Sequence, residues 1–357
     1  MKIIHCADIH LDSPMGTHMT AEKSEMRNAE VLRSFIKLTE YAAENQVRAV
    51  IIAGDLFDGD VVKHSTVDAV LSAFEKAYSV DFLYLPGNHD SADRILTGHH
   101  IPHNLKLFDT TWRTYSYDDV DVSGIALTDR NAGSLYDEVP HAENKINIVA
   151  LHGQIGNDFN ADTVRLNSLK DKKIDYLALG HIHSYFVSAL GTCGMYCYSG
   201  CLEGRGFDEC GKKGFVELSI TNGLLQHRFV EFANRELHRI EIDVTGALKT
   251  SDVERMMKNS IDSIPSRDMV EFILQGALSP DANISMTDLN SFITNRFFFT
   301  KIKDESRLAI SYKDYKNDIS LKGEFIRTVL SGNDSDEDKD AIIRIGLAAL
   351  RGEDIRV

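Results

Sequence analysis

Short apolar runs alternate with stretches of helical periodicity over the first half of the chain. Apolar residues recur at helical spacing over 27–45, a second helix is expected at 65–78, and a short amphipathic stretch lies at 163–170. The strands expected from the apolar runs cover residues 2–8, 47–55, 80–90 (with a turn), 146–153 and 174–183. This alternation predicts an α/β domain with partly parallel strands.

The second half of the chain changes its pattern twice. Three runs separated by turn residues, at 194–200, 214–220 and 225–232, predict antiparallel strands that complete a second sheet. From residue 236 a small β-α-β-α-β unit is expected, and an acidic segment at 332–340 then precedes an apolar helix at 341–351. The sequence therefore predicts three parts, which cover residues 1–235, 236–318 and 319–357.

Composition narrows the class of protein. The 357 residues, 43% of them hydrophobic, are enough for one large core or two domains. No apolar run approaches the ~18 residues of a membrane span, and the opening MKIIHCADIH lacks the basic segment of a signal peptide, so we expect a cytoplasmic protein without membrane contact. Five cysteines do not suggest a disulfide framework. The net charge of −15 argues against strong nucleic-acid binding by this chain alone.

Polar residues follow the apolar strands at the points where the strands end. They form the motifs DIH at 8–10, GDLFD at 54–58, GNHD at 87–90, LHG at 151–153 and GHIH at 180–183. The carboxyl ends of strands are where α/β sheets build their sites, and residues at i and i+2 of a strand share a face. A single such motif could be an ordinary turn or a buried histidine pair, but five in succession predict one shared site.

The residue types in these motifs indicate metal chemistry. The candidate ligands are Asp8, His10, Asp55, Asn88, His152, His181 and His183. This set is larger than one metal needs, so two metals sharing a carboxylate are expected. Mixed oxygen and imidazole ligation suits two divalent ions such as Mn²⁺, with iron or zinc as alternatives, and the absence of cysteine disfavours a structural zinc site. Two adjacent metals form a clamp for phosphoryl transfer.

The five motifs, in this order, resemble the conserved blocks of the calcineurin-like metallophosphoesterases over about residues 1–232. The resemblance implies an α/β fold with a two-sheet β-sandwich core flanked by helices. It also implies two ligand groups that share a bridging Asp55. One metal would be held by Asp8, His10, Asp55 and His183. The other would be held by Asp55, Asn88, His152 and His181.

A catalytic pair is expected beside these ligands. By the same resemblance, His89 would face the scissile phosphate and stabilise or protonate the leaving oxygen. Asp90 follows it directly and is expected to orient the His89 ring by accepting an N–H.

Two further stretches resemble the SbcD-type DNA-repair nucleases, and in detail their YhaO-like bacterial exonuclease members. They are IHCADIHLDSP at 4–14 and YSGCLEGRGFDECGKKG at 198–214. This branch implies that a small α/β capping domain helps to hold DNA, and that a C-terminal helical segment docks on an SMC-like ATPase of the SbcC type. It also implies a homodimer. Asp58 departs from the histidine that archaeal and eukaryotic members carry at this position.

Candidate contacts to substrate phosphate are Arg205, Lys212 and Lys213, and earlier in the chain Lys170, Lys172 and Lys173. For the lysines, an ordinary solvated face is the more typical setting. Cys193, Cys197 and Cys201 are expected to be small core residues, and His99, His100 and His103 to lie in a polar loop. The function expected is that of a two-metal phosphodiesterase acting on DNA ends. The alternatives are a small-molecule phosphodiesterase or phosphatase on the same metal core, and an adaptor that mainly docks an SMC-like ATPase.

Overall fold

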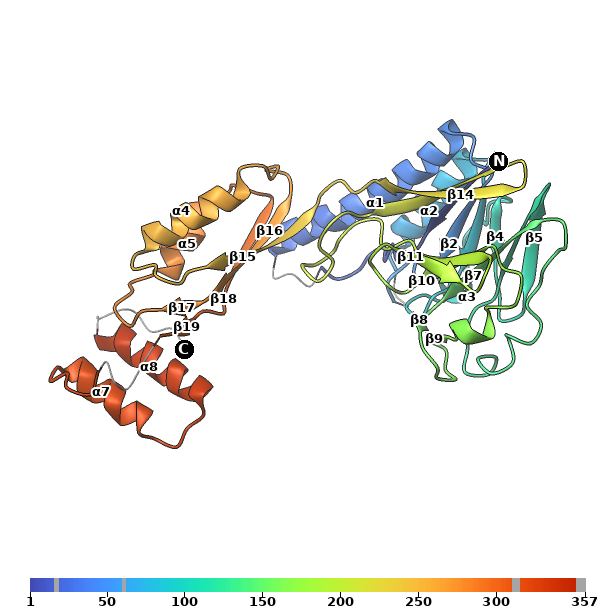
Figure 1. Ribbon diagram of the computed structural model, residues 1–357. Helices are drawn as coiled ribbons and strands as arrows, with labels where there is room; N and C mark the ends of the chain where they lie inside the picture. Colours follow the sequence, from blue (N-terminus) through green and yellow to red (C-terminus); the bar gives the residue numbers. More distant parts are fainter. Residues whose placement is uncertain (16–18, 60–61, 310–314, 351–357) are drawn as a thin grey trace. The chain divides into compact units, whose positions relative to one another are not determined.

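The computed structural model describes residues 1–15, 19–59, 62–309 and 315–350. The chain divides into two compact units, Met1–Glu236 and Leu237–Val357, close to the point where the sequence pattern changes (Figure 1). None of the helices in the described ranges combines the length and the apolar character that a membrane crossing requires.

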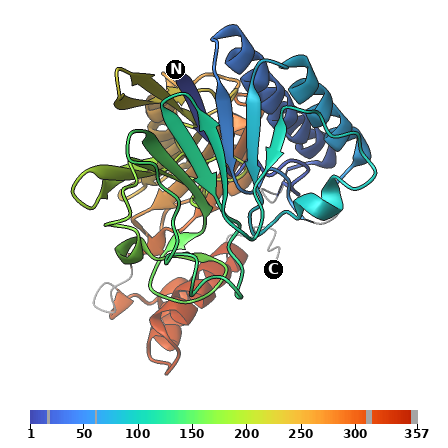
Figure 2. The same ribbon diagram turned by 90° about the vertical axis from the view of Figure 1, so that its right-hand side faces the viewer.

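The first unit contains two sheets of six strands each (Figure 2). In the first sheet, four strands run parallel and a hairpin pairs antiparallel with β1. Its order is β14 (Leu224–Glu231), β13 (Gly214–Thr221), β1 (Lys2–Cys6), β2 (Ala49–Ala53), β3 (Asp81–Leu85) and β4 (Leu105–Leu107). The second sheet has the order β11 (Phe186–Leu190), β12 (Gly194–Tyr198), β10 (Tyr176–Gly180), β7 (Ile146–His152), β6 (Val120–Gly124) and β5 (Arg113–Tyr117).

The two sheets pack face to face. Ile51 and Leu83 of the first sheet share one buried core with Ile148 and Ala178 of the second. On the opposite face of the first sheet, α1 (Ala21–Glu44) and α2 (His64–Lys76) cover a second core that includes Phe35. Every residue of β2 is buried because both faces of its sheet are covered. The expected β-sandwich with flanking helices is confirmed, although the outer face of the second sheet packs against irregular segments rather than helices.

One local expectation was wrong. The runs at 214–220 and 225–232 form β13 and β14, which extend the first sheet rather than the second. The 15 residues between β12 and β13 are long enough to carry the chain from one sheet to the other, and the local pattern of a strand does not specify its partner. The short amphipathic stretch at 163–170 forms β9 (Thr163–Val164) and a 3₁₀ turn at Leu166–Ser168.

The second unit contains the expected β-α-β-α-β arrangement. Its three parallel strands are β15 (Leu237–Asp243), β16 (Met269–Gln275) and β18 (Phe299–Asp304), with β16 in the centre. Its helices α4 (Thr250–Ile261) and α5 (Met286–Ile293) contribute to one core with the sheet. The short strands β17 (Ala277–Leu278) and β19 (Arg307–Leu308) pair with each other, and α7 (Leu321–Leu330) packs against α8 (Asp336–Leu350).

Candidate metal centre

The strand ends of the first unit hold the site in a constrained backbone. Four of the candidate ligands have positive φ angles, namely Asp8 (54°), His10 (49°), Asp55 (52°) and His181 (101°). This conformation is uncommon for residues with a side chain and clusters at functional sites. Glycine at position 87 is required by packing, because a Cβ there would lie 2.0 Å from Oδ1 of Asp55. The glycine of the GNHD motif therefore allows the β3 loop to approach the carboxylate.

The first predicted ligand group is brought together by β1, β2 and β10. Nε2 of His10 lies 3.3 Å from Nε2 of His183 and 3.6 Å from Oδ2 of Asp55. Asp8 is fully buried and its carboxylate accepts the backbone N–H of residue 181 at 2.8 and 3.1 Å. Asp8, His10 and His183 each offer one ligand atom, and these atoms all lie within 4.8 Å of one another.

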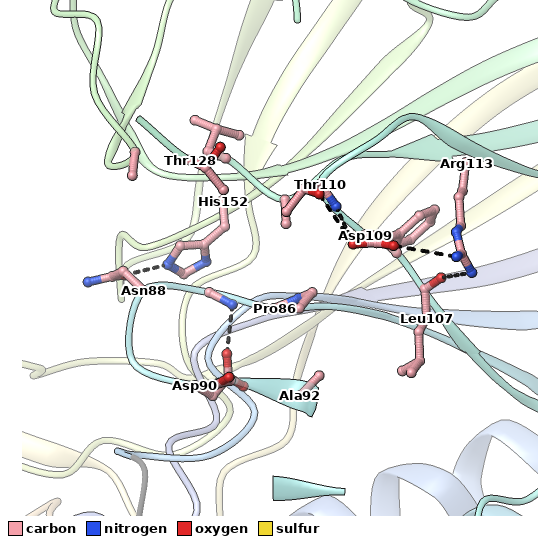
Figure 3. A pocket seen from close by; sticks show the side chains of 16 residues that line it. Pro86, Asn88, Asp90, Ala92, Leu107, Asp109, Thr110, Arg113, Thr128 and His152 are labelled. Carbon is pink, nitrogen blue, oxygen red and sulfur yellow. Dashed lines mark hydrogen bonds and ion pairs between the residues drawn. The ribbon is translucent and has the colours of Figure 1, made fainter. Parts of the chain in front are cut away.

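The second predicted group lies beside the first. Nε2 of His152 lies 2.9 Å from Oδ1 of Asn88 and 3.3 Å from Oδ2 of Asp55, and Nδ1 of His181 lies 3.3 Å from the same Asn88 oxygen. Figure 3 shows Asn88 and His152 facing each other at the edge of a pocket. Because Oδ2 of Asp55 approaches both His10 and His152, Asp55 is the residue common to the two groups.

The tautomers of two rings test whether these residues fit metal ions. Nδ1 of His152 donates to the Ala53 carbonyl at 2.9 Å, and Nδ1 of His183 donates to Oε1 of Glu209 at 2.7 Å. In the neutral rings, each Nε2 then carries a lone pair, and these lone pairs face the Asn88 oxygen and the His10 ring. When the rings are neutral, acceptors that converge in this way repel one another unless a proton or a metal cation lies between them. The residues therefore fit divalent metal ions.

The electrostatics of the site also favour a positive charge. Burial opposes ionisation of Asp55, but the hydrogen bond and charge of His152 and the charge of His10 dominate and lower the pKa of Asp55 to about 2. Burial likewise opposes protonation of His152, yet the hydrogen bond and charge of Asp55 raise its pKa to about 9. Burial raises the pKa of Asp8. The enclosed carboxylates thus create a field that stabilises cations.

The His89 ring is oriented by Asp58 and not, as we expected, by Asp90. Nδ1 of His89 pairs with Oδ1 of Asp58 at 2.9 Å, and the same oxygen lies 3.4 Å from Nδ1 of His10. The hydrogen bond with His10 outweighs partial burial and holds the pKa of Asp58 well below its usual range. The His89 side chain is 51% exposed, so its other ring nitrogen is accessible to a substrate.

Asp90 instead stabilises the loops that carry the ligands. It is buried and accepts backbone N–H groups from Gly87 at 2.7 Å and from Leu56 at 2.8 Å, together with the Tyr84 hydroxyl. These bonds join the GDLFD loop to the GNHD loop. Adjacency in sequence suggested a contact with His89, but the two side chains have different partners in the structure.

The three predicted phosphate contacts have different environments. Lys213 is 3% exposed, and its Nζ donates to the His183 carbonyl at 2.6 Å, so this expected substrate contact is corrected to a support of the histidine loop. Lys212 is exposed and pairs with Glu231. Arg205 lies beside the first ligand group, where it donates to Glu209 at 2.8 Å and to Ser13 Oγ at 3.1 Å.

Glu209 is a residue of the site that sequence reasoning missed. It is 5% exposed, and besides His183 it accepts the backbone N–H of Arg205 at 2.7 Å. Burial opposes its ionisation, but the hydrogen bond from His183 and the charge of Arg205 hold its pKa well below the usual range. The only indication of Glu209 in the sequence was its position within the glycine-rich stretch 198–214. Carboxylates behind a metal-binding histidine fix the ring and its tautomer.

The cysteine and loop-histidine candidates do not join the predicted ligand groups. Cys197 and Cys201 are buried and Cys193 is exposed, and within the described ranges no group of converging metal-ligand atoms includes them. His99 is not a free polar side chain, because it bonds Asp68 at 2.8 Å and His64 at 3.0 Å.

This arrangement of a two-sheet sandwich with acidic and imidazole ligands at its strand ends is that of a metal-dependent phosphoesterase. The calcineurin-like phosphoesterase family matches residues 1–185, which is more than half of the chain. The chain belongs to this family, and it is a metal-dependent hydrolase. The expected family is confirmed.

The relatives of this chain include proteins named as a metallophosphoesterase, a nuclease subunit and a DNA-repair protein. The metallophosphoesterase YhaO of Bacillus subtilis is 23% identical over 77% of this chain and 72% of its own length. The SbcD component of the SbcCD nuclease of Staphylococcus epidermidis is 24% identical over 68% of this chain and 73% of its own length. The DNA double-strand break repair protein Mre11 of Methanosarcina acetivorans is 24% identical over 85% of this chain, which spans half of that protein. These relatives confirm the SbcD-type branch.

Solved structures resemble part of this chain loosely. A dimetal phosphatase from Danio rerio superposes with a TM-score of 0.44 and 12% identity, over 65% of this chain and 97% of its own. A protein of Thermus thermophilus superposes with a TM-score of 0.40 and 13% identity, over 64% of this chain and 98% of its own.

Proposed function

We propose that this chain is a dinuclear phosphodiesterase that cleaves DNA at its ends. The proposal rests on the convergence of the seven candidate ligands around Asp55, next to a histidine whose Nδ1 pairs with Asp58. The two positions would hold divalent ions, for which we propose Mn²⁺. When bound, such ions supply Lewis acidity and activate a water molecule.

The roles of the chain's own residues follow from their contacts. In its doubly protonated form, His89 would donate its Nε2 proton to the departing sugar oxygen when the P–O bond breaks, because Asp58 accepts from its Nδ1–H and leaves Nε2–H toward the open side. Asp58 and Glu209 position the imidazoles of His10, His89 and His183. Arg205 would hold Glu209 in place and contribute positive charge near the phosphate.

The partners proposed for this chain are DNA, an SMC-like ATPase of the SbcC type and a second copy of the chain, in the cytoplasm. The relatives named as repair proteins support DNA as the substrate. With a net charge of −15, binding of DNA by this chain alone is expected to be weak and strongly salt-dependent. We propose that residues 236–318 help to hold DNA and that residues 319–357 contact the ATPase.

A substrate panel tests the proposal. The purified protein is incubated with Mn²⁺ and single-stranded, double-stranded or hairpin DNA, beside bis(p-nitrophenyl) phosphate and p-nitrophenyl phosphate. The proposal predicts release of nucleotides from DNA and cleavage of the diester in preference to the monoester. Efficient hydrolysis of the monoester without cleavage of any DNA would favour a small-molecule phosphatase instead. If the metal-loaded protein hydrolyses none of these substrates, the result would favour the adaptor that docks an SMC-like ATPase.

A further inference from the structure

A pocket of about 320 Å³ lies beside the second ligand group in the first unit (Figure 3). Asn88 and His152 form one side of it. Its other walls come from the segments that follow β3, β4 and β6, at residues 86–92, 107–110 and 126–128, and from Arg113 at the start of β5. Asn88 and His152 are candidate metal ligands, whereas none of the residues in the more distant walls is.

The lining combines an apolar floor with a polar edge. Leu107, Phe108 and Ala126 provide carbon surface, whereas Asp109 and Arg113 stand at the edge opposite the ligands, as Figure 3 shows. The Asp109 carboxylate lies 3.5 Å from the Arg113 guanidinium, so the two charges offset each other. An uncharged, flat ligand with hydrogen-bonding groups along its edge suits this lining better than a second phosphate would.

The walls are held by bonds that do not depend on a ligand. The Asp109 carboxylate accepts the backbone N–H of Thr110 at 2.7 Å, and the Asn131 side chain donates to the carbonyls of Thr110 at 3.1 Å and Ala126 at 2.9 Å. A Cβ at position 124 would lie 2.8 Å from the Phe108 ring, so the glycine there lets the ring pack on β6. Preformed walls of this kind are typical of small-molecule sites.

We infer that this pocket holds the nucleoside on one side of the scissile phosphate. The inference rests on the proposed function, which places the phosphate at the metal centre next to Asn88 and His152. A nucleobase is flat and apolar on its faces and carries donors and acceptors on its edge. The volume lies at the lower end of the ~300–1,000 Å³ of ligand pockets, which suits one nucleoside rather than a run of bases.

Three diesters with the same leaving group test the pocket. They are methyl p-nitrophenyl phosphate and the p-nitrophenyl esters of thymidine 5′-phosphate and thymidine 3′-phosphate, each assayed with the Mn²⁺-loaded protein. Thr110→Trp introduces an indole from the exposed edge of the pocket. The neighbouring Thr111→Trp is the matched control, because Thr111 is also exposed but does not line the pocket.

Wild type is expected to prefer one of the thymidine esters over the methyl ester by at least about tenfold in kcat/KM, and Thr110→Trp to lose that preference. Thr111→Trp should retain it. Equal kcat/KM for all three esters in wild type, or an unchanged preference in Thr110→Trp, would overturn the nucleoside pocket while leaving the phosphodiesterase intact.

A binding measurement separates failure of the pocket from failure of the proposed function. If none of the esters is hydrolysed, the phosphodiesterase proposal fails. Calorimetry with thymidine 5′- and 3′-monophosphate then decides the pocket, because Thr110→Trp should weaken the tighter of the two by about tenfold or more. No detectable binding of either nucleotide by the wild-type protein would overturn the pocket.

Discussion

At the scale of single residues, the carboxylate of Asp58 lies beside two imidazole rings. It lies 2.9 Å from Nδ1 of His89 and 3.4 Å from Nδ1 of His10, so one side chain connects a proposed metal ligand with the proposed proton donor. The motif GDLFD identified this residue, but only the folded chain shows what it contacts. Residues that act as a unit are expected to give non-additive losses when they are replaced.

His89→Asn is predicted to lower kcat for phosphodiester hydrolysis by about 10²–10⁴-fold, because it removes the proton donor. Asp58→Asn should lower kcat by about 10- to 100-fold through misorientation of the rings. The kcat of the double variant should lie within a small factor of the kcat of His89→Asn. Steady-state kinetics with Mn²⁺ measure all three, and Asp119→Asn, on an exposed turn, is the control. Losses that multiply would show that Asp58 acts independently of His89.

At the scale of elements, a buried ion cluster anchors α1 to the stretch 203–204. Arg27 is fully buried and donates to Glu30 at 2.6 Å, to Glu203 at 3.1 Å and to the carbonyl of Gly204 at 2.8 Å. The same stretch precedes Arg205 and Glu209, which support His183. The anchoring of α1 therefore also holds the backbone behind a proposed metal ligand.

Arg27→Ala is predicted to lower the free energy of unfolding by about 3–5 kcal/mol, because it leaves the buried Glu203 carboxylate without its charged partner. Urea unfolding followed by circular dichroism measures the change. Arg33→Ala, on an exposed position of the same helix, should stay within about 0.5 kcal/mol of wild type. Similar stabilities of the two variants would contradict the proposed anchor.

His5 on β1 is predicted to make stability depend on pH. Its ring is fully buried against the Tyr176 hydroxyl, and burial lowers its pKa from the usual 6.5 to about 3. Below pH 6.5 the unfolded chain binds a proton at this ring that the folded chain does not. The free energy of unfolding should therefore fall by up to about 1.4 kcal/mol per pH unit as the pH decreases.

Unfolding curves between pH 6.5 and 5 test this dependence. Wild type should lose about 2 kcal/mol more than His5→Gln over this interval, because the glutamine does not titrate. Parallel pH profiles of the two proteins would show that the ring is protonated equally easily in both states.

Several elements could be predicted from sequence because their signals are local. The β1, β2, β7 and β10 strands are mostly apolar, and each candidate ligand lies at the end of a strand or a few residues after it. β5 was not recognised, because its sequence RTYSY is mostly polar and it lies at the edge of its sheet. The pairing of β13 with β1 joins residues more than 200 positions apart, which no local pattern encodes.

The supporting contacts of the site were not predictable for a related reason. Glu209 meets His183 across 26 positions, and Asp58 meets His89 across 31. A motif gives the residue types that a reaction needs, whereas the partner of each second nitrogen depends on how the loops pack. The same reason explains why the role expected of Asp90 belongs to Asp58.

At the scale of the whole molecule, the second unit leaves apolar surface on its last helix. Ile343 and Leu347 of α8 are buried against α7, while Ile342 and Ile345 are 40% and 48% exposed. Only one apolar face of this expected helix is therefore buried. This surface supports the proposal that the C-terminal segment contacts an ATPase partner.

Ile345→Glu is predicted to weaken binding of the coiled coil of an SMC-like ATPase by about tenfold or more, because a charge replaces exposed carbon surface. The free energy of unfolding should not change. Leu248→Glu, at another exposed apolar residue of this unit, is the control for added charge. Binding measured by surface plasmon resonance that is equal for both variants and wild type would exclude this face of α8.

The central claim is that one site holds two metal ions which the reaction requires. Metal-free protein is titrated with Mn²⁺, and bound metal is counted by elemental analysis while hydrolysis of bis(p-nitrophenyl) phosphate is recorded. Wild type should bind about two equivalents per chain and gain activity as the second binds, whereas His183→Asn should retain about one equivalent and lose activity. Full activity in metal-free protein, or two tightly bound equivalents and full activity in His183→Asn, would contradict the assignment of this site.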